Sequence, residues 1–252
     1  MAQEQPDFLP IAAGGCPATI RLVHLQNPPM KIPACSVPLF AALVATSVFA
    51  AEPDGPVAPT GRIDLFNGKD LSGWTVCLKG DAPAAATFAV NSGLMHCTGQ
   101  PFGYIRTDRS FRDYKLTVEW RFVRIAEHAD NSGVFVHLQP PDHVWPRCIE
   151  NQGQYHQQGA LIFLGGATFK GTNGPAKGMI KRQGTPNEKP AGEWNTYEIV
   201  CRGDTVKNYV NGSFLNVANG CNPAAGAIAM QSEGGEWELR QIYVEPLPPV
   251  DP

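Results

Sequence analysis

Alternation of large apolar and polar side chains is the feature that most constrains the fold of this chain. In YKLTVEWRF, residues 114–122, a large side chain occupies every second position, beginning with Tyr114. Successive side chains of a β-strand point to opposite faces, so a period of two is typical of a strand with one buried face. The segment therefore predicts a half-buried strand.

Further strands are predicted in SGVFVHLQ (132–139), in TYEIVCRGDTVKNYVNG and in GAIAMQSEGGEWELRQIYVEPL. Turns are expected at Gly203–Asp204, at Asn211–Gly212 and at Gly234–Gly235, since Asn-Gly and similar pairs are typical of hairpin turns. The 26 glycines and 23 prolines fit a chain with many turns. Because no stretch has a sustained helical period, we expect an all-β chain with two antiparallel sheets in a jelly-roll sandwich.

The sequence MKIPACSVPLFAALVATSVFAAEP, which starts at Met30, has the layout of a secretory signal peptide. A lysine precedes an apolar run that is too short for a membrane span and ends at Ala50. We expect Met30 to be the true start, cleavage near Ala50 and export to the periplasm or medium. An uncleaved amphiphilic leader is the alternative. The expected organisation is a leader (1–51), a proline-rich linker (52–61) and one β-sandwich domain (62–248).

Export would place five cysteines in an oxidising compartment. We expect disulfides between Cys77 and Cys97 and between Cys201 and Cys221, with Cys148 left over. The alternative is that all five are small buried hydrophobic residues. The net charge of −3 and pI of about 6.1 give no reason to expect a nucleic-acid partner.

The stretch WPRCIENQGQYHQQG, residues 145–159, gathers a carboxylate, several amides and an imidazole. If it begins as a strand, Cys148, Glu150 and Gln152 share one face. We expect that face to line a cleft and to continue into a loop that carries His156. The surrounding segment, 137–190, is rich in Gly and Gln, and we expect its second half, residues 165–190, to be mostly loop.

Five segments, in order, give the chain a family resemblance: LFNGKDLSGW, NSGVFVH, IENQGQ, GEWNTYEIVCRGDTVKNYVNG and GAIAMQSEGGEWELRQIYVEPL. Over roughly residues 62–248 the chain resembles the 3-keto-disaccharide hydrolase domain family. The resemblance implies a concanavalin-like, laminin-G-like sandwich and exported bacterial proteins that act on glycosides whose C3 hydroxyl has become a ketone. At His137 we expect an arginine in many relatives, so substrate or activity can differ there.

The ketone makes the C2 proton of such a glycoside acidic. A base removes that proton, the C1 substituent leaves by β-elimination, and water can add to the enone. The site needs a base, a group that stabilises the enolate oxygen, and an acid for the leaving group. A divalent metal could polarise the carbonyl.

Glu150 is the candidate base, His137 a candidate acid or metal ligand, and Glu233 a second carboxylate near a strand end. Each has a structural alternative: a solvated carboxylate, a hydrogen-bonded histidine and a turn-forming residue. Candidate substrate contacts are Gln152, Trp145 as a stacking platform, Gln231, Asn131, Arg106, Lys170, His156 and His143.

A bound divalent metal ion is left as an open alternative, with no ion named. Its candidate ligands are His128, His137, His143, His156 and Glu150, although none has close ligand spacing such as HxH. The chain also lacks an ExDxxE run, which disfavours ordinary glycosidase chemistry. We therefore expect a carbohydrate-active enzyme of 3-keto-glycosides. The alternative is a non-catalytic, lectin-like carbohydrate-binding module on the same fold.

Overall fold

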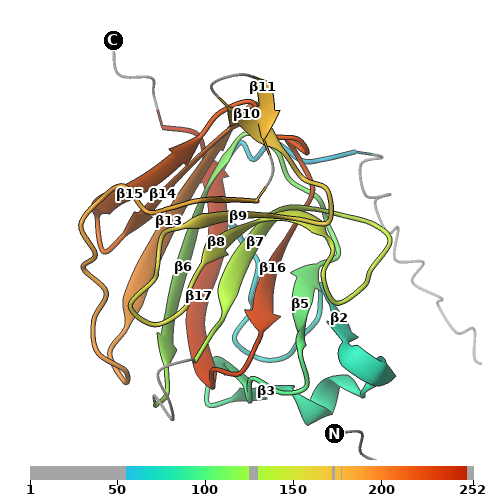
Figure 1. The fold of residues 1–252 in the computed structure, drawn as a ribbon. Coiled ribbons are helices and arrows are strands. Elements are labelled where there is room, and N and C mark those ends of the chain that lie inside the picture. The colour runs from blue at the N-terminus through green and yellow to red at the C-terminus, as the bar shows by residue number, and fades with distance from the viewer. Residues whose placement is uncertain (1–54, 125–129, 172–173, 177, 249–252) are drawn as a thin grey trace, which may run out of the picture. The chain divides into compact units, whose positions relative to one another are not determined.

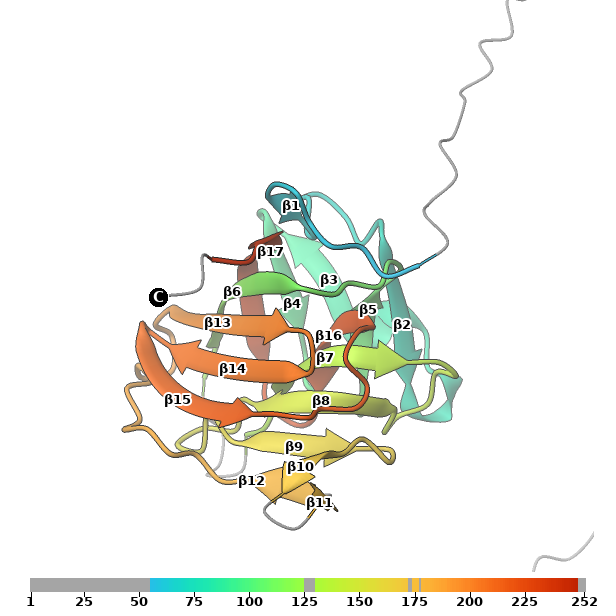
Figure 2. The same ribbon diagram turned by 90° about the horizontal axis from the view of Figure 1, so that it is seen from above.

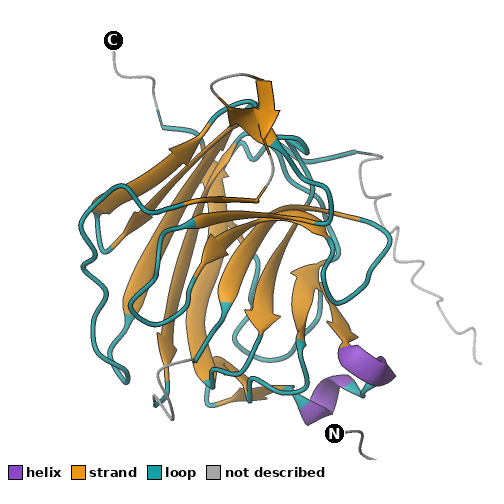
Figure 3. Cartoon of the chain, in the orientation of Figure 1, coloured by secondary structure: helices purple, strands orange, loops and turns teal. Residues whose placement is uncertain are grey.

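Two antiparallel β-sheets face each other in the structure, a computed structural model that describes residues 55–124, 130–171, 174–176 and 178–248 (Figure 1). The predicted signal peptide and His128 lie outside these residues. Strands and loops dominate, with two short 3-10 helices at Lys79–Asp81 and Ala84–Ala86 (Figure 3). In the described part of the chain, no helix has the length and apolarity that a membrane span requires.

The sheet that we call the back sheet has eight strands. Along it lie β15 (Ser213–Ala218), β14 (Thr205–Val210), β13 (Asn195–Arg202), β6 (Tyr114–Phe122), β17 (Trp237–Pro246), β4 (Leu94–Cys97) and β3 (Phe88–Asn91), with β1 (Ile63–Asp64) paired to β17.

The other sheet, which we call the front sheet, has seven strands. Their order is β12 (Gly178–Ile180), β9 (Leu161–Leu164), β8 (Arg147–Gln152), β7 (Gly133–Gln139), β16 (Ala227–Ser232), β5 (Gly103–Thr107) and β2 (Trp74–Leu78). A separate hairpin is formed by β10 (Phe169–Gly171) and β11 (Gly174–Ala176) (Figure 2).

The main core lies between the two sheets and follows the predicted alternation. On β6 the side chains of Tyr114, Leu116, Val118 and Trp120 are almost fully buried. They pack in one hydrophobic cluster with Val134, Ile149 and Met230 of the front sheet and with other side chains of both sheets. Burial of apolar area from both inner faces is the main source of stability in such a sandwich. The jelly-roll expectation is confirmed.

The turns that the sequence predicts are present. Residues 203–204 join β13 to β14, and residues 211–212 join β14 to β15. Gly234 and Gly235 lie between β16 and β17, but these two strands belong to different sheets, so the segment crosses the sandwich instead of closing a hairpin. Most of the described residues of 165–190 lie in loops and turns, as predicted, although three short strands, β10, β11 and β12, also lie there.

The predicted disulfides are absent, since all five of the described cysteines are free. Cys97 is in the core between the sheets, whereas Cys77 packs with a second cluster on the front sheet. Cys201 and Cys221 are both buried in the main core, yet they are not bonded. The alternative reading, small buried residues, fits four of the five, Cys77 being partly exposed.

A β-bulge in β7 changes the direction of His137. The pairing of β7 with β8 shifts between Val136 and Gln139, and His137 has a φ of 57°. Its ring packs edge-on against Tyr114 of the back sheet, and Nδ1 lies 3.1 Å from the carbonyl oxygen of Pro223. A bulge inserts a residue and breaks the strict alternation of faces. His137 therefore points into the core, whereas Phe135 points outward.

Candidate active site on the outer face of the front sheet

The strand register brings Glu150 to the outer face of the front sheet. Its Cα partner on β7 is Phe135, which pairs in turn with Ala229 of β16. The alternate residues Val134, Ile149 and Met230 face the core between the sheets. Directly opposite residues of an antiparallel pair share a face. The row through Glu150 therefore faces away from that core, as the sequence predicts for the polar face of β8.

Glu150 is buried on this face without a full set of partners. Only 3% of the residue is exposed, and Oε1 has no hydrogen-bond partner within the described chain. Burial raises the pKa of the carboxyl to about 8, and the charge of Glu233 adds to the shift. Both effects disfavour the ionised form. Glu150 is thus a carboxyl that exchanges its proton near neutral pH.

Gln231 lies on β16, which is separated from the strand of Glu150, β8, by β7. The residue is 1% exposed, and neither Nε2 nor Oε1 makes a hydrogen bond of normal geometry to a described residue. It lies on the same face of the sheet as Glu150, because Ala229, two residues earlier on β16, belongs to the Glu150 row. Buried polar atoms nearly always have partners. The amide of Gln231, which interacts with Glu233, therefore has hydrogen-bonding capacity that no described residue uses fully.

Glu233 and Asn131 close the same end of the sheet. Asn131 Nδ2 donates to Glu233 Oε2 at 2.6 Å, and backbone bridges also connect these residues. Burial raises the pKa of Glu233, and the amide of Gln231 partly offsets this. Both residues are partly exposed, unlike Glu150. The pair is therefore within reach of solvent, whereas the carboxyl of Glu150 is not.

The loop between β7 and β8 is held to β5 by hydrogen bonds of Asp142. Asp142 accepts hydrogen bonds from Tyr104 Oη at 2.9 Å and from Arg106 Nε and Nη2 at 2.8 and 2.7 Å. Tyr104 and Arg106 are both on β5, so one carboxylate anchors the loop to that strand. Arg106 is accordingly engaged by Asp142 instead of being free for a substrate. Sequence reasoning missed Tyr104 and Asp142, because nothing local marks them.

Two other predicted contacts lie on or beside this face. Gln152 is two residues beyond Glu150, opposite Gly133. Its Oε1 accepts hydrogen bonds from the backbone N–H groups of Gly153 and Gln154, so this oxygen shapes the turn after β8. Trp145 lies in the anchored loop with 44% of its surface exposed, as a stacking platform requires.

The remaining predictions do not converge on Glu150. His137 faces the core, as described above. His156 is mostly exposed, and its Nδ1 pairs with Glu188 Oε1 at 3.1 Å. Lys170 is in the β10–β11 hairpin, at the top of Figure 1, whereas β16 reaches the Glu233 end at the bottom. These residues were predicted as site residues because they lie in or near loops or have long side chains. The strands and turns that carry them place them away from the face of Glu150.

The expected metal ligands do not form a cluster either. Among the described residues, no three His, Cys, Asp or Glu side chains gather in a way that could hold a metal ion. His137 packs in the core and His156 pairs with Glu188. His143 is the residue after Asp142, in the loop that Asp142 holds to β5. The chemistry that this face offers is that of carboxyl and amide groups.

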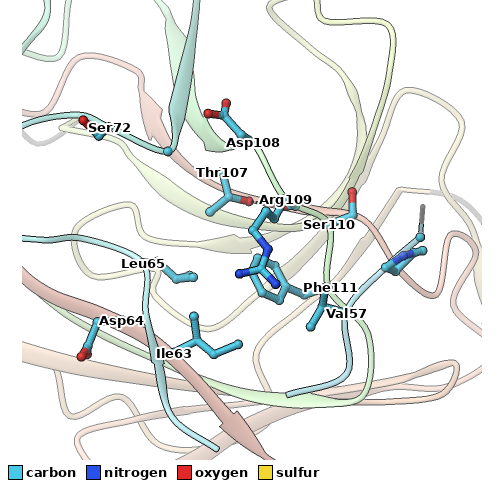
Figure 4. Close-up of a pocket in the computed structure, with 13 residues that line it drawn as sticks. Val57, Ile63, Asp64, Leu65, Ser72, Thr107, Asp108, Arg109, Ser110 and Phe111 are labelled. Carbon is cyan, nitrogen blue, oxygen red and sulfur yellow. Dashed lines mark hydrogen bonds between the residues drawn. The ribbon is translucent and has the colours of Figure 1, made fainter. Parts of the chain in front are cut away.

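A separate cavity of about 600 Å³ lies at the far end of β5 (Figure 4). It is lined by the segments 55–57, 63–65, 72–73 and 107–111. The guanidinium of Arg109 lies 5.8 Å from the ring centroid of Phe111 there. Thr107 ends β5 on this side, whereas Gly103 and Tyr104 are at the end beside Gln231 and Ser232. The cavity is therefore distinct from the carboxyl face.

The structure is thus that of a jelly-roll protein whose front sheet carries the carboxyls of Glu150 and Glu233 and the amide of Gln231 at its outer face. Residues 61–245 match the 3-keto-alpha-glucoside-1,2-lyase-like domain, so the chain belongs to that family. No curated protein sequence matches it.

Solved structures share the fold at low sequence identity. Two proteins of Parabacteroides distasonis ATCC 8503, provisionally assigned as glycosyl hydrolases, have TM-scores of 0.53 and 0.54 at 19% and 16% identity. The matches cover 75% and 74% of this chain and 94% and 99% of theirs. A β-glucanase of Bacillus licheniformis has a TM-score of 0.50 at 16% identity, covering 73% of this chain and 98% of its own.

Proposed function

We propose that the protein cleaves 3-keto-glycosides by removing the C2 proton and eliminating the C1 substituent. The observation that carries the proposal is the buried Glu150 carboxyl, with a free oxygen and a pKa of about 8, on the same sheet face as the amide of Gln231. Membership of the 3-keto-alpha-glucoside-1,2-lyase-like family supports the choice of substrate.

Glu150 is the proposed base. A carboxylate with a raised pKa has a greater affinity for a proton than an ordinary one, and a base is most effective when its pKa lies near the working pH. Burial also removes water that would compete for the carboxylate. The proton at C2 is acidified by the adjacent ketone, and the electron pair that it leaves moves into the C3 carbonyl. Glu150 ends the step protonated.

Gln231 and the two carboxyls supply the other roles. The free Nε2 of Gln231 can donate to the C3 oxygen as negative charge develops on it, which is where a preorganised donor contributes most. Protonated Glu150 can return its proton to the oxygen that leaves C1 on the β9 side, and the carboxyl of Glu233 can exchange a proton with water on the β16 side. Its partial exposure also places it where water can enter and add to the enone. The hydrogen bond from Asn131 holds Glu233 in position.

The test uses the mature chain from about residue 52 and a 3-keto-glucoside, with release of the C1 substituent as the readout. We expect turnover by the native protein and a loss of 10²-fold or more in Glu150→Gln, the usual contribution of a general base. Glu188→Gln is the matched control, because it also removes a carboxyl with little side-chain exposure, here one paired with His156. The control should keep its activity.

Retention of turnover in Glu150→Gln would refute the assignment of the base. If the native protein turned over no 3-keto-glycoside but bound sugars, the binding-module alternative would replace the enzyme. EDTA provides a further arm: a loss of turnover that added divalent metal restores would contradict the roles given to the carboxyl and amide groups alone.

We also propose that the mature protein is exported, since its substrate would be extracellular or periplasmic sugar. The support is the signal-like sequence from Met30 to Ala51. Expression of the full chain in a bacterial host, followed by N-terminal sequencing of the secreted form, should give a start near residue 51. Retention of residues before Met30 in that form would refute it.

A further inference from the structure

We propose that the front sheet continues past Glu150 as a subsite for an apolar C1 substituent, formed by Ile162 and Met179. This inference rests on the function proposed above and specifies its substrate class. The leaving group would be an aromatic or aliphatic aglycone instead of a second sugar.

The strand register carries the argument. Ile162 of β9 is the Cα partner of Glu150, and Met179 of β12 is the partner of Ile162. Their chain neighbours Leu161, Phe163 and Ile180 pack into the core between the sheets. Ile162 and Met179 therefore face outward, in the row that also holds Glu150. Figure 2 shows β9 and then β12 toward the edge of the sheet.

The apolar side chains at the end of the row that starts at Glu150 are unusually exposed to solvent. Met179 is 51% exposed, the largest value among the exposed large apolar side chains of the described residues. Ile162 is partly exposed, and so is Leu164, the next outward residue of β9, which packs beside Cys148. A continuous apolar strip thus begins at the buried carboxyl and runs off the sheet edge. An isolated exposed methionine would need no explanation, but a strip that starts at a reactive group does.

The spacing of the strip fits the chemistry of the step. The substituent leaves C1, and C1 is bonded to the C2 carbon whose proton Glu150 takes. Neighbouring strands are about 4.8 Å apart, so Ile162 and Met179 extend about 10 Å beyond Glu150. This length matches one aromatic ring with its linking oxygen. A second sugar would need hydrogen-bonding groups, whereas this row offers methyl groups and an adaptable thioether.

The experiment compares benzyl and methyl 3-keto-glucosides, which have similar alkoxide leaving groups. In Met179→Ser we expect kcat/KM for the benzyl substrate to fall about 5-fold, in the range expected for a lost apolar contact, with no change for the methyl substrate. Because Met179 is half exposed, the substitution should not unfold the protein. Phe214→Ser is the control, since Phe214 is 41% exposed on β15 of the back sheet.

Equal losses for both substrates, or no loss for the benzyl substrate, would overturn the subsite while leaving the proposed function intact. Turnover of neither substrate by the native protein would refute the proposed function, and the subsite with it. Unchanged kinetics of Phe214→Ser are required, because a change there would show that the assay responds to surface apolarity in general.

Discussion

The carboxyl of Glu150 occupies the space that a side chain at Gly133 would need. A Cβ at residue 133 would lie 2.7 Å from Glu150 Oε1 and 2.9 Å from its Cγ. These separations are shorter than van der Waals contact, so the glycine is what allows the buried acid to lie flat against β7. The first prediction follows from this contact.

Gly133→Ala should displace the Glu150 side chain and lower kcat by about 10-fold or more, because catalytic groups tolerate little misplacement. Some stability will also be lost through overpacking, by about 1–3 kcal/mol. Kinetics and chemical denaturation measure the two effects separately. Gly61→Ala is the control, since a Cβ at that position meets nothing within 4 Å. Full activity in Gly133→Ala would contradict the proposed position of the base.

The pKa of Glu150 predicts the pH dependence of activity. The base must be ionised, so kcat/KM should rise with pH and level off above about 8. A pH–rate profile of the native protein measures this. A profile that is flat between pH 6 and 9 would argue against Glu150 as the base.

Stability should change in the opposite direction. The folded-state pKa of Glu150 lies above its ordinary value of 4.5, so the folded protein binds the proton more tightly than the unfolded chain does. The stabilisation is fully present below about pH 4.5 and is lost as pH rises through about 8. Its upper bound is roughly 5 kcal/mol, from about 3.5 pKa units. In Glu150→Gln this contribution to the pH slope of unfolding free energy should disappear, and denaturant titrations at several pH values test it.

Gln231→Leu should separate stability from activity. Leucine has a similar size and removes two buried polar atoms that lack partners, so the free energy of unfolding should rise by about 1 kcal/mol. The same change removes the proposed donor to the C3 oxygen and should lower kcat by about 10²-fold. Thermal denaturation and steady-state kinetics give the two readouts. A more stable variant with normal kcat would exclude Gln231 from the chemistry.

Asp142→Asn should loosen the loop that crosses the front sheet. The variant loses the charge that Arg106 pairs with and one bidentate ion pair. We expect faster hydrogen exchange in residues 140–146 and a KM several-fold higher, with kcat little changed. Asp64→Asn is the control, because it removes the partner of Arg62 in a more exposed ion pair. Unchanged exchange in the loop would show that other contacts hold it.

Much of the fold could be predicted because its signals are local. The alternation of buried and exposed side chains on β6 and the turn at Gly203–Asp204 depend only on residues close together in the sequence, and both are present in the structure. The strand face of Glu150 could also be predicted this way, since it depends on residues two positions away. The short strands β10 to β12 were missed, because three-residue strands carry too little pattern to show a period.

The rest of the site depends on pairing between distant segments, which periodicity does not report. The contact of Asp142 with Tyr104 joins residues 38 positions apart, and nothing beside either residue marks it. The inward turn of His137 comes from a bulge, a single extra residue that reverses the expected face. The predicted disulfide between Cys77 and Cys97 was wrong for a similar reason, because strand membership does not say which sheet face a cysteine takes.

The bulge in β7 has a consequence for comparing relatives of this protein. A residue there must accept a positive φ and fit against Tyr114, so backbone shape and core volume select its identity. Differences between family members at position 137 should therefore follow changes in the opposing sheet. Substrate preference should follow differences at positions 162 and 179 instead, where side chains can vary without disturbing the interior.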